Sequence, residues 1–333
     1  MTTQYSPENP GASRHRPRRH RALLPLAALV GVLGLAGCAT REDSTENTPS
    51  SQSATQDGGF PAEVAFGDAD PVTIPAQPDR IISLSPSVTE MLFAIGAGDQ
   101  VIAADDNSDY PPEAPTSELS GFTINPQAVA DEDPDLVIAS SDTETEDLVT
   151  AMDIVEVPVL LLPAATELAD TYAQIEVLGT ATGHAEAAQD LASDLEAQID
   201  EIVTTTEAQE GMTVFHEVSE DLYSAGSATF IGQIYGLFGL TNIADEAAGG
   251  GDYPQLANEF VVESDPDLIF LADAQCCGQS AETVAARPGW ETMTAVRNGD
   301  IIALDDDIAS RWGPRVVELV AAVAEAVDAT ATE

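Results

Sequence analysis

The sequence predicts an α/β protein made of two lobes of related plan that are joined by one long helix. A repeat is the first sign, because Asp-Pro-Asp followed by a short apolar run occurs at 133–138 and again at 265–270. Each copy follows an apolar strand and a helix that ends at glycine, which is the unit from which α/β proteins are built. Between the copies, at 184–207, Leu195 and Ile199 belong to an apolar stripe with helical spacing. A helix of this length spans roughly 36 Å, enough to connect two small lobes.

Residues 1–37 have the pattern of an export signal. Five arginines form a basic region, and the apolar run that follows at 23–36 is too short to span a bilayer comfortably. The run ends in Ala-Gly directly before Cys38, which resembles the lipobox of bacterial lipoproteins. That resemblance implies cleavage before Cys38, lipidation of its sulfur and an anchor on the outer face of the cell membrane. The alternative is an ordinary signal peptide with an incidental cysteine, and Arg18-Arg19 leaves Sec and twin-Arg export both open.

Composition and pattern divide the rest of the chain into four parts. Residues 38–59 are rich in Ser, Thr, Gln and acidic residues, so we expect a disordered tether that buries no core. The N-terminal lobe is expected at 60–183, the bridging helix at 184–207 and the C-terminal lobe at 208–333.

Short apolar runs predict the strands of both lobes. In chain order they lie at 80–84, 101–104, 136–138, 213–215, 268–271 and 301–304. After the first of these strands, Ser85 and the proline that follows it favour the start of a helix, which glycine ends at position 96.

The charge balance and the motifs limit the function. The chain has 58 acidic and 11 basic residues, and its formal net charge is −47. Nucleic acid is excluded as a partner, because phosphate binding needs a cationic surface. The sequence contains no Gly-x-Ser-x-Gly, no Gly-rich phosphate loop and no His-Glu-x-x-His, so we predict that the protein is not an enzyme.

Nine short motifs lie in one order along about residues 79–327. They occur at 80–90, 96–99, 109–114, 125–126, 133–138, 253–255, 265–267, 287–290 and 313–315. In this order they resemble the periplasmic-binding-protein family for vitamin B12 and ferric siderophores. The resemblance implies two Rossmann-like lobes that are bridged by one long α-helix and hold the ligand between them.

The resemblance also implies an extracytoplasmic solute-binding lipoprotein of an ABC importer. Such a protein captures a metal chelate of the vitamin B12 (corrinoid) or ferric siderophore class and delivers it to a membrane permease that works with an ATPase. The cobalt or iron chelate is cargo, and no permanently bound cofactor is expected. A haem-binding uptake lipoprotein of the same fold and a non-transport surface sensor or adhesin are the alternatives.

Open parallel sheets bind ligands outside the carboxyl ends of their strands, so the candidates come from loops that follow strands and from the segments beside them. A corrinoid or porphyrin is a broad, mostly apolar disc with a polar rim, so aromatic side chains suit its faces and arginines suit its rim. The candidate ligand-binding residues are Asp106, Asn107, Phe122, His216, Tyr223, Tyr253, Arg311, Trp312 and Arg315.

Several candidates have a second interpretation. Trp312 would also serve to plug the base of a lobe, and Arg315 would also pair with Glu318. His216 is either an axial ligand to the metal of the chelate or a polar residue satisfied within the fold. Where B12 binders tend to carry an aromatic residue in the first loop, this chain has Asn107, so the identity of the chelate stays open.

Cys276 and Cys277 are adjacent. Their Cα atoms lie about 3.8 Å apart across a trans peptide, below the usual disulfide range of about 4.4–6.8 Å. Two thiols, a vicinal disulfide and a pair of metal ligands all stay open at this point. Only His184 and His216 follow the export signal, too few histidines for a site that binds a bare metal ion.

In B12-binding members of the family, one glutamate on each lobe meets arginines of the permease. The corresponding positions are Glu259 in the C-terminal lobe and Gln127 in the N-terminal lobe. Gln127 departs from the pattern of the family, and Asp131 or Glu132 is the expected substitute.

Overall fold

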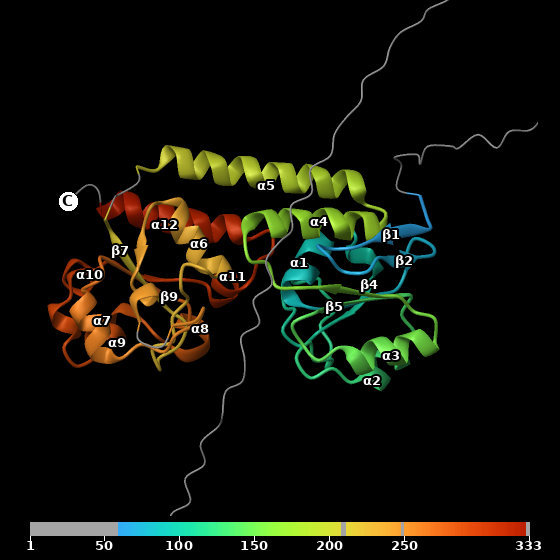
Figure 1. Ribbon diagram of the computed structural model, residues 1–333, viewed down its shortest axis with the longest axis horizontal. Coiled ribbons are helices and arrows are strands. Elements are labelled where there is room, and N and C mark those ends of the chain that lie inside the picture. The colour runs from blue at the N-terminus through green and yellow to red at the C-terminus, as the bar shows by residue number, and fades with distance from the viewer. Residues whose placement is uncertain (1–58, 208–210, 248–249, 331–333) are drawn as a thin grey trace, which may run out of the picture. The chain divides into compact units, whose positions relative to one another are not determined.

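The computed structural model describes residues 59–207, 211–247 and 250–330, and these belong to one compact unit. They form two parallel β-sheets with helices packed around them (Figure 1). The expected export signal, Cys38 and the tether up to residue 58 lie outside the described residues. Among the helices that the structure describes, none is both long enough and apolar enough to cross a membrane.

The first sheet forms the centre of what we call the first lobe. Its strand order is β4-β3-β5-β6, and all neighbours are parallel. The strands are β3 (Ile81–Leu84), β4 (Val101–Ala104), β5 (Leu136–Ser140) and β6 (Val159–Leu162). β3 is buried at every position, because helices cover both faces of a parallel sheet. A small antiparallel pair, β1 (Ala62–Val64) and β2 (Val72–Ile74), precedes it in the chain.

The first lobe takes its helices from signals that are visible in the sequence. They are α1 (Pro86–Ala94), α2 (Pro126–Asp131), α3 (Glu146–Ile154) and α4 (Leu168–Thr182), with a 3₁₀ turn at Gly98–Gln100. Pro86 begins α1 as expected, and the Asn125 side chain caps α2 by accepting bonds from two backbone N–H groups. Gly183, at a φ of 79°, ends α4 in the left-handed conformation that favours glycine.

The second lobe repeats the topology of the first. Its strands are β7 (Thr213–Glu217), β8 (Thr241–Asn242), β9 (Leu268–Leu271) and β10 (Ile301–Ala303), in the parallel order β10-β9-β7-β8. In each lobe the first strand lies between the second and the third, and the fourth lies outside the third. The repeated Asp-Pro-Asp motif precedes the third strand in both lobes, so the sequence repeat is a repeat of topology.

Apart from α12, the helices of the second lobe have at most eight residues. They are α6 (Phe230–Leu237), α7 (Asn258–Ser264), α8 (Ala274–Cys277), α9 (Ala281–Ala285), α10 (Thr294–Asn298), α11 (Asp306–Ser310) and α12 (Val316–Thr330). Two 3₁₀ turns, Ile243–Glu246 and Trp290–Thr292, complete the lobe.

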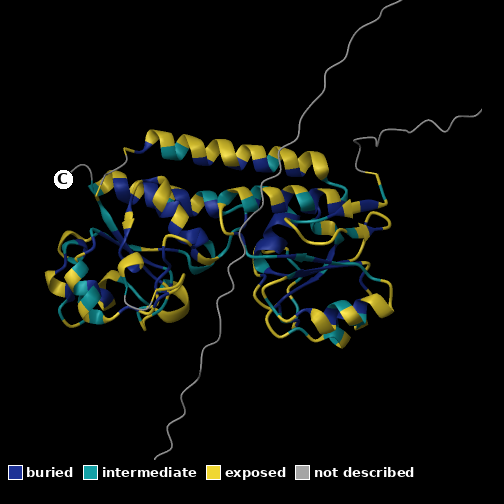
Figure 2. Ribbon diagram, in the orientation of Figure 1, coloured by how far each residue is buried: buried dark blue, intermediate teal, exposed yellow. Residues whose placement is uncertain are grey.

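The long helix between the sheets is α5 (Ala185–Thr205), close to the expected range of 184–207. It packs on α4 and on α12 (Figure 1). Ala192 and Leu195 lie in the core around the first sheet, whereas Ile199 lies in the core around the second. The outer face of α5 is exposed, whereas the central strands β3 and β5 of the first sheet and β7 and β9 of the second are almost wholly buried (Figure 2). The apolar stripe of α5 therefore packs into the first core with its N-terminal part and into the second core with its C-terminal part.

Candidate functional site

A cleft of about 460 Å³ lies where the strand order of the first sheet reverses. β3 has β4 on one side and β5 on the other, and open parallel sheets bind their ligands at such a switch point. The first lobe lines the cleft with the end of β3 and with the segments that follow its strands, and the second lobe lines it with α11 and the two residues after it. A hollow of about 550 Å³ between β10 and α12 contains none of the predicted site residues.

Four predicted residues line this cleft: Asn107, Phe122, Arg311 and Trp312. Phe122 is 74 % exposed, so its ring is available to a ligand. Asp106 is not among the lining residues, but its carboxylate accepts a hydrogen bond from the side chain of Asn107 (3.0 Å). The structure thus brings together predicted residues of the first lobe and the two predicted residues that follow α11.

Four predicted residues of the second lobe do not line the cleft: His216, Tyr223, Tyr253 and Arg315. His216 is fully buried and contacts the hydroxyl of Tyr235 through Nδ1 (2.7 Å). Its Nε2 has no hydrogen-bond partner within the described part of the chain, and burial lowers its pKa to about 4. Tyr223 and Tyr253 are exposed, but they do not line the 460 Å³ cleft.

Glu90 of α1 holds both arginines that were predicted to meet the ligand. Arg311 Nη1 lies 3.1 Å from Glu90 Oε1, and Arg315 donates to the same carboxylate from Nη2 (2.6 Å) and Nε (3.1 Å). The side chain of Glu90 is only 2 % exposed. At Gly313 a Cβ would lie 2.8 Å from Glu90 Oε2, so glycine allows this close approach. Arg315 therefore pairs with the first lobe and not with Glu318.

Arg311 and Trp312 join the two lobes beneath the cleft. Arg311 Nη2 also donates to the carbonyl of Asn107 (2.9 Å) and lies 3.1 Å from Asp109 and 2.6 Å from Asp307. Trp312 packs against both hydrophobic cores, and its Nε1 donates to Gln174 (3.2 Å). Trp312 thus combines the two interpretations of its position, because it lines the cleft and also closes the base of the lobes.

Asp105 is a cleft residue that the sequence analysis missed. It directly follows β4, lines the cleft and is 1 % exposed. Oδ1 accepts a hydrogen bond from the hydroxyl of Ser108, whereas Oδ2 has no partner among the described residues. Burial raises the pKa of Asp105, and the bond from Ser108 opposes that rise.

The strand ends of the second lobe carry a second buried acidic group. Glu217 ends β7 and forms a bidentate pair with Arg287 (2.5 and 2.6 Å), whose guanidinium lies 4.6 Å from the ring centroid of Trp290. Asp273, two residues after β9, is fully buried, and neither carboxylate oxygen has a partner in the described chain. Burial and the charge of Glu217 raise the pKa of Asp273 to about 6.

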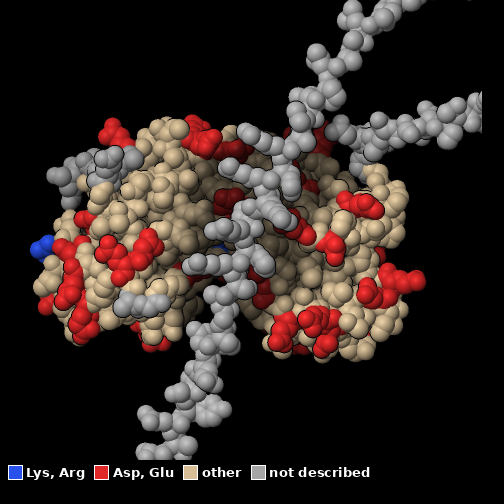
Figure 3. Space-filling view, viewed as in Figure 1, with Lys and Arg blue, Asp and Glu red and all other residues tan. Residues whose placement is uncertain are grey.

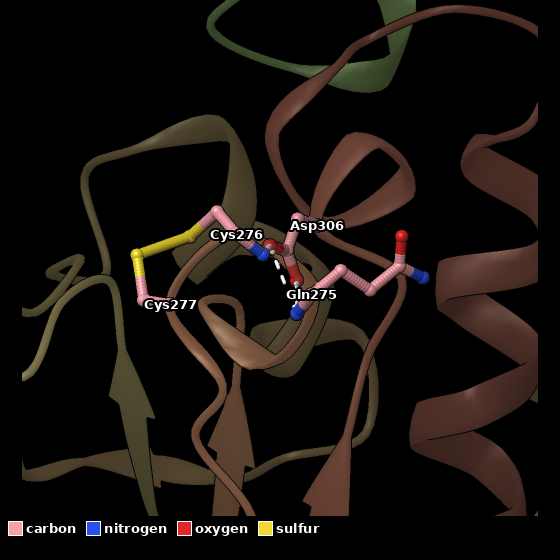
Figure 4. Close-up of a disulfide and its surroundings, with 4 residues drawn as sticks. All are labelled: Gln275, Cys276, Cys277 and Asp306. Carbon is pink, nitrogen blue, oxygen red and sulfur yellow. Dashed lines mark hydrogen bonds between the residues drawn. A yellow bond between two sulfur atoms is a disulfide. The ribbon is translucent and has the colours of Figure 1, made fainter.

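Cys276 and Cys277 form a vicinal disulfide at the end of α8 (Figure 4). Both residues are exposed, and neither lines the cleft. The carboxylate of Asp306 accepts bonds from the backbone N–H groups of Gln275 (3.0 Å) and Cys276 (2.6 Å), which ties α8 to α11. Over the described residues, no group of three or more His, Cys, Asp or Glu side chains is placed to hold a metal ion.

On the face that Figure 3 shows, acidic side chains are scattered over both lobes and far exceed the basic ones. Basic side chains are sparse, since the described residues include Arg80, Arg287, Arg297, Arg311 and Arg315 and no lysine. A ligand therefore approaches through a negative potential, which favours neutral or cationic molecules.

Comparison with known proteins gives consistent results. A model of the periplasmic binding protein family matches residues 81–308. The uncharacterized ABC transporter substrate-binding lipoprotein YvrC of Bacillus subtilis is 30 % identical over 317 residues, which cover 93 % of this chain and 98 % of that protein. The vitamin B12-binding protein of Pectobacterium carotovorum is 31 % identical over 247 residues, or 73 % and 86 % of the two chains. The periplasmic heme-binding protein RhuT of Roseiflexus, solved in apo form, has a TM-score of 0.67 at 25 % identity and covers 76 % of this chain and 99 % of its own.

Proposed function

Because this chain belongs to the periplasmic binding protein family, we propose that it is the lipid-anchored solute-binding protein of an ABC importer and that it carries a corrinoid or a related metal chelate. The family consists of binding proteins, so the chain is not an enzyme. The observation that carries the proposal is the cleft at the switch point of the first sheet, which both lobes line.

The chemistry of the cleft supports a broad, amide-bearing ligand. Its volume of about 460 Å³ lies within the range of small-molecule sites. Phe122 and Trp312 offer aromatic surface to the faces of a macrocycle, and Asn107 offers an amide to its rim. The relative from Pectobacterium, named as a vitamin B12-binding protein, supports the corrinoid class.

Haem is the second candidate, and the likeness to the heme-binding protein RhuT favours it. A haem iron needs an axial ligand, and haem propionates need cationic partners. His216 is buried away from the cleft, and Glu90 occupies both Arg311 and Arg315. These placements favour a corrinoid over haem.

The experiment is a fluorescence titration of the full chain carrying Cys38→Ser with cyanocobalamin, haemin and a panel of ferric siderophores. The chain has two tryptophans, and only Trp312 lines the cleft, because Trp290 is fully buried in the second lobe. Saturable quenching by cyanocobalamin at sub-micromolar concentration supports the proposal, and the Trp312→Phe variant should lose the part of the signal that comes from the cleft. If the protein binds haemin or a ferric chelate and does not bind cyanocobalamin, the cargo is that ligand and not a corrinoid.

We propose that Cys38 carries the lipid anchor. The small residues before it resemble a lipobox, and the relative from Bacillus subtilis is named a lipoprotein. In cells, the wild-type protein should remain with the membrane fraction and incorporate labelled palmitate. The Cys38→Ser variant should lose the label, and a variant that keeps it would refute the assignment.

We propose that Glu259 and Gln127 mark the surface that meets the permease. Each is the second residue of the helix before the third strand of its lobe, α7 for Glu259 and α2 for Gln127, so the two positions are equivalent in the repeat. Both side chains are exposed, and Gln127 donates to the carboxylate of Asp131 (2.7 Å). This contact supports Asp131 as the acidic group on that side.

Charge reversal at this surface tests the docking role. Glu259→Arg should lower ligand uptake by cells and leave the affinity of the purified protein unchanged. Glu325→Arg makes the same charge change at an exposed position of α12 and should leave uptake intact. Loss of ligand affinity in Glu259→Arg would contradict a docking role.

A further inference from the structure

The one cleft-lining carboxylate that is fully buried in the described chain belongs to Asp105. Its side chain is 1 % exposed, while Asp142 and Asp307, which also line the cleft, are more exposed. Ser108 satisfies Oδ1, and Oδ2 has no partner among residues 59–207, 211–247 and 250–330. A buried carboxylate oxygen without a donor is costly, so a donor from outside the protein would be favoured there.

Buried hydroxyl groups hold the carboxylate of Asp105 in one orientation. Thr89 Oγ1 lies 2.9 Å from Ser108 Oγ and 2.8 Å from Ser83 Oγ, and all three hydroxyl residues are buried. The backbone N–H of Asp105 donates to the carbonyl of Ser83 (3.0 Å), which fixes the start of the loop. Rotation of the carboxylate would break the bond from Ser108, so the free oxygen has a defined position.

Gly121 lies close beside this oxygen. A Cβ at this position would lie 3.2 Å from Asp105 Oδ2 and 2.6 Å from the carbonyl oxygen of Leu84. The second distance is shorter than real Cβ contacts, so any larger residue would force the loop to move. Gly121 and Asp105 both line the cleft, so a side chain at position 121 would crowd the carboxylate oxygen of Asp105.

The cleft offers no free cation to a ligand. Arg311 is the only basic residue that lines it within the described chain, and Glu90, Asp109 and Asp307 already pair with its guanidinium. A carboxylate on the rim of a ligand would therefore lose water and gain no partner, which is unfavourable. A primary amide on the rim would donate to a charged acceptor, and such hydrogen bonds are stronger than those between neutral groups.

We propose that Asp105 determines the specificity for the ligand, because its free oxygen accepts a hydrogen bond from an N–H group on the rim of the chelate. Asp105 thereby favours macrocycles decorated with amides over macrocycles decorated with carboxylates. This inference rests on the proposed function, since it takes the cargo to be a macrocyclic chelate.

The test uses two corrinoids that differ in their rims: cobinamide, whose side chains are amides, and cobyrinic acid, whose side chains are carboxylates. Each is titrated into the full chain carrying Cys38→Ser, with Asp105 intact or changed to Asn. Asp99→Asn is the matched control, because exposed Asp99 precedes β4 whereas Asp105 follows it. Asp105→Ser removes the charge with a smaller side chain and serves as a second variant if Asp105→Asn does not fold.

We expect Asp105→Asn to bind cobinamide about 10-fold to 100-fold more weakly, the range for a lost charge-assisted hydrogen bond, and to bind cobyrinic acid more tightly. Asp99→Asn should change neither affinity. If the intact protein binds cobinamide and the Asp105 variants bind both corrinoids as it does, the inference is wrong and the proposed function stands. If the intact protein binds neither corrinoid, the corrinoid ligand and this inference fail together.

Discussion

Replacing Glu90 with glutamine should destabilise the protein, because this one buried carboxylate holds two arginines. Its contacts with Arg311 and Arg315 are 2.6–3.1 Å long, and its side chain is 2 % exposed. In Glu90→Gln, Arg311 keeps Asp109 and Asp307. Arg315 loses its one ion pair among the described residues and keeps the ring of Tyr110, 4.0 Å from its guanidinium carbon, and the more distant charges of Asp305 and Asp307.

The expected loss in the free energy of unfolding follows from the contacts that each arginine loses. Removing one partner of a buried ion pair costs about 3–5 kcal/mol, and we expect the lower end because glutamine leaves one acceptor and Arg311 keeps two carboxylates. In a protein of this order of size, a loss of about 3 kcal/mol lowers the midpoint of thermal unfolding by roughly 6–12 °C.

The assay is thermal unfolding followed by circular dichroism, supported by urea denaturation at neutral pH. Arg315→Met and the double variant complete a double-mutant cycle, and we expect a coupling energy above about 1 kcal/mol between Glu90 and Arg315. A loss below about 1 kcal/mol in Glu90→Gln would refute the reasoning. It would mean that Glu90 does not hold the two arginines in solution.

Other substitutions test other parts of the structure. Gly121→Ala should weaken ligand binding, since its Cβ would lie 2.6 Å from a backbone carbonyl of β3; unchanged affinity in calorimetry would contradict that crowding. Burial lowers the pKa of His216 from 6.5 to about 4, so the native state prefers the neutral imidazole. The stability that depends on this neutral form is complete above pH 6.5 and falls as the pH drops from 6.5 to 4. This pH dependence of the free energy of unfolding should vanish in His216→Phe. The pKa of Asp273 is raised from 3.8 to about 6, so its ionisation destabilises the native state as the pH rises, the opposite of the effect at His216. Asp273→Asn should therefore increase the free energy of unfolding above pH 6 by about 1–3 kcal/mol and have little effect below pH 3.8. In the folded Cys38→Ser chain, thiol titration should find no reactive cysteine before reduction and two after it, because Cys276 and Cys277 are both exposed.

The sequence was sufficient to predict the architecture because that information is local and repeated. The Asp-Pro-Asp motifs precede the third strand of each sheet, and the stripe with Leu195 and Ile199 forms the helix that enters both cores. Gly183 and Pro86 mark helix boundaries through their own backbone preferences. Each of these signals lies within a few residues of the structure that it specifies.

The candidate site was predicted less well, because its contacts join distant residues. Glu90 and Arg315 are 225 positions apart, and no local pattern indicates that this glutamate of α1 pairs with that arginine. His216 lies at a strand end, yet the packing of Tyr235 decides that its ring faces the core. Asp105 carried one weak signal, a serine three residues later that is able to bond its carboxylate.

The contribution of α5 to both cores has a consequence for the kinetics of transport. A helix that packs into both cores, together with arginines fixed to Glu90, resists a large swing of one lobe away from the other. The cleft is then preorganised, so a ligand loses little affinity to reordering of the protein when it binds. Differences in affinity between chelates should therefore appear mainly as differences in dissociation rate. We therefore expect rapid unloading at the membrane to depend on separation of the lobes by the permease, which would make the residence time of the cargo a property of the complex and not of the binding protein alone.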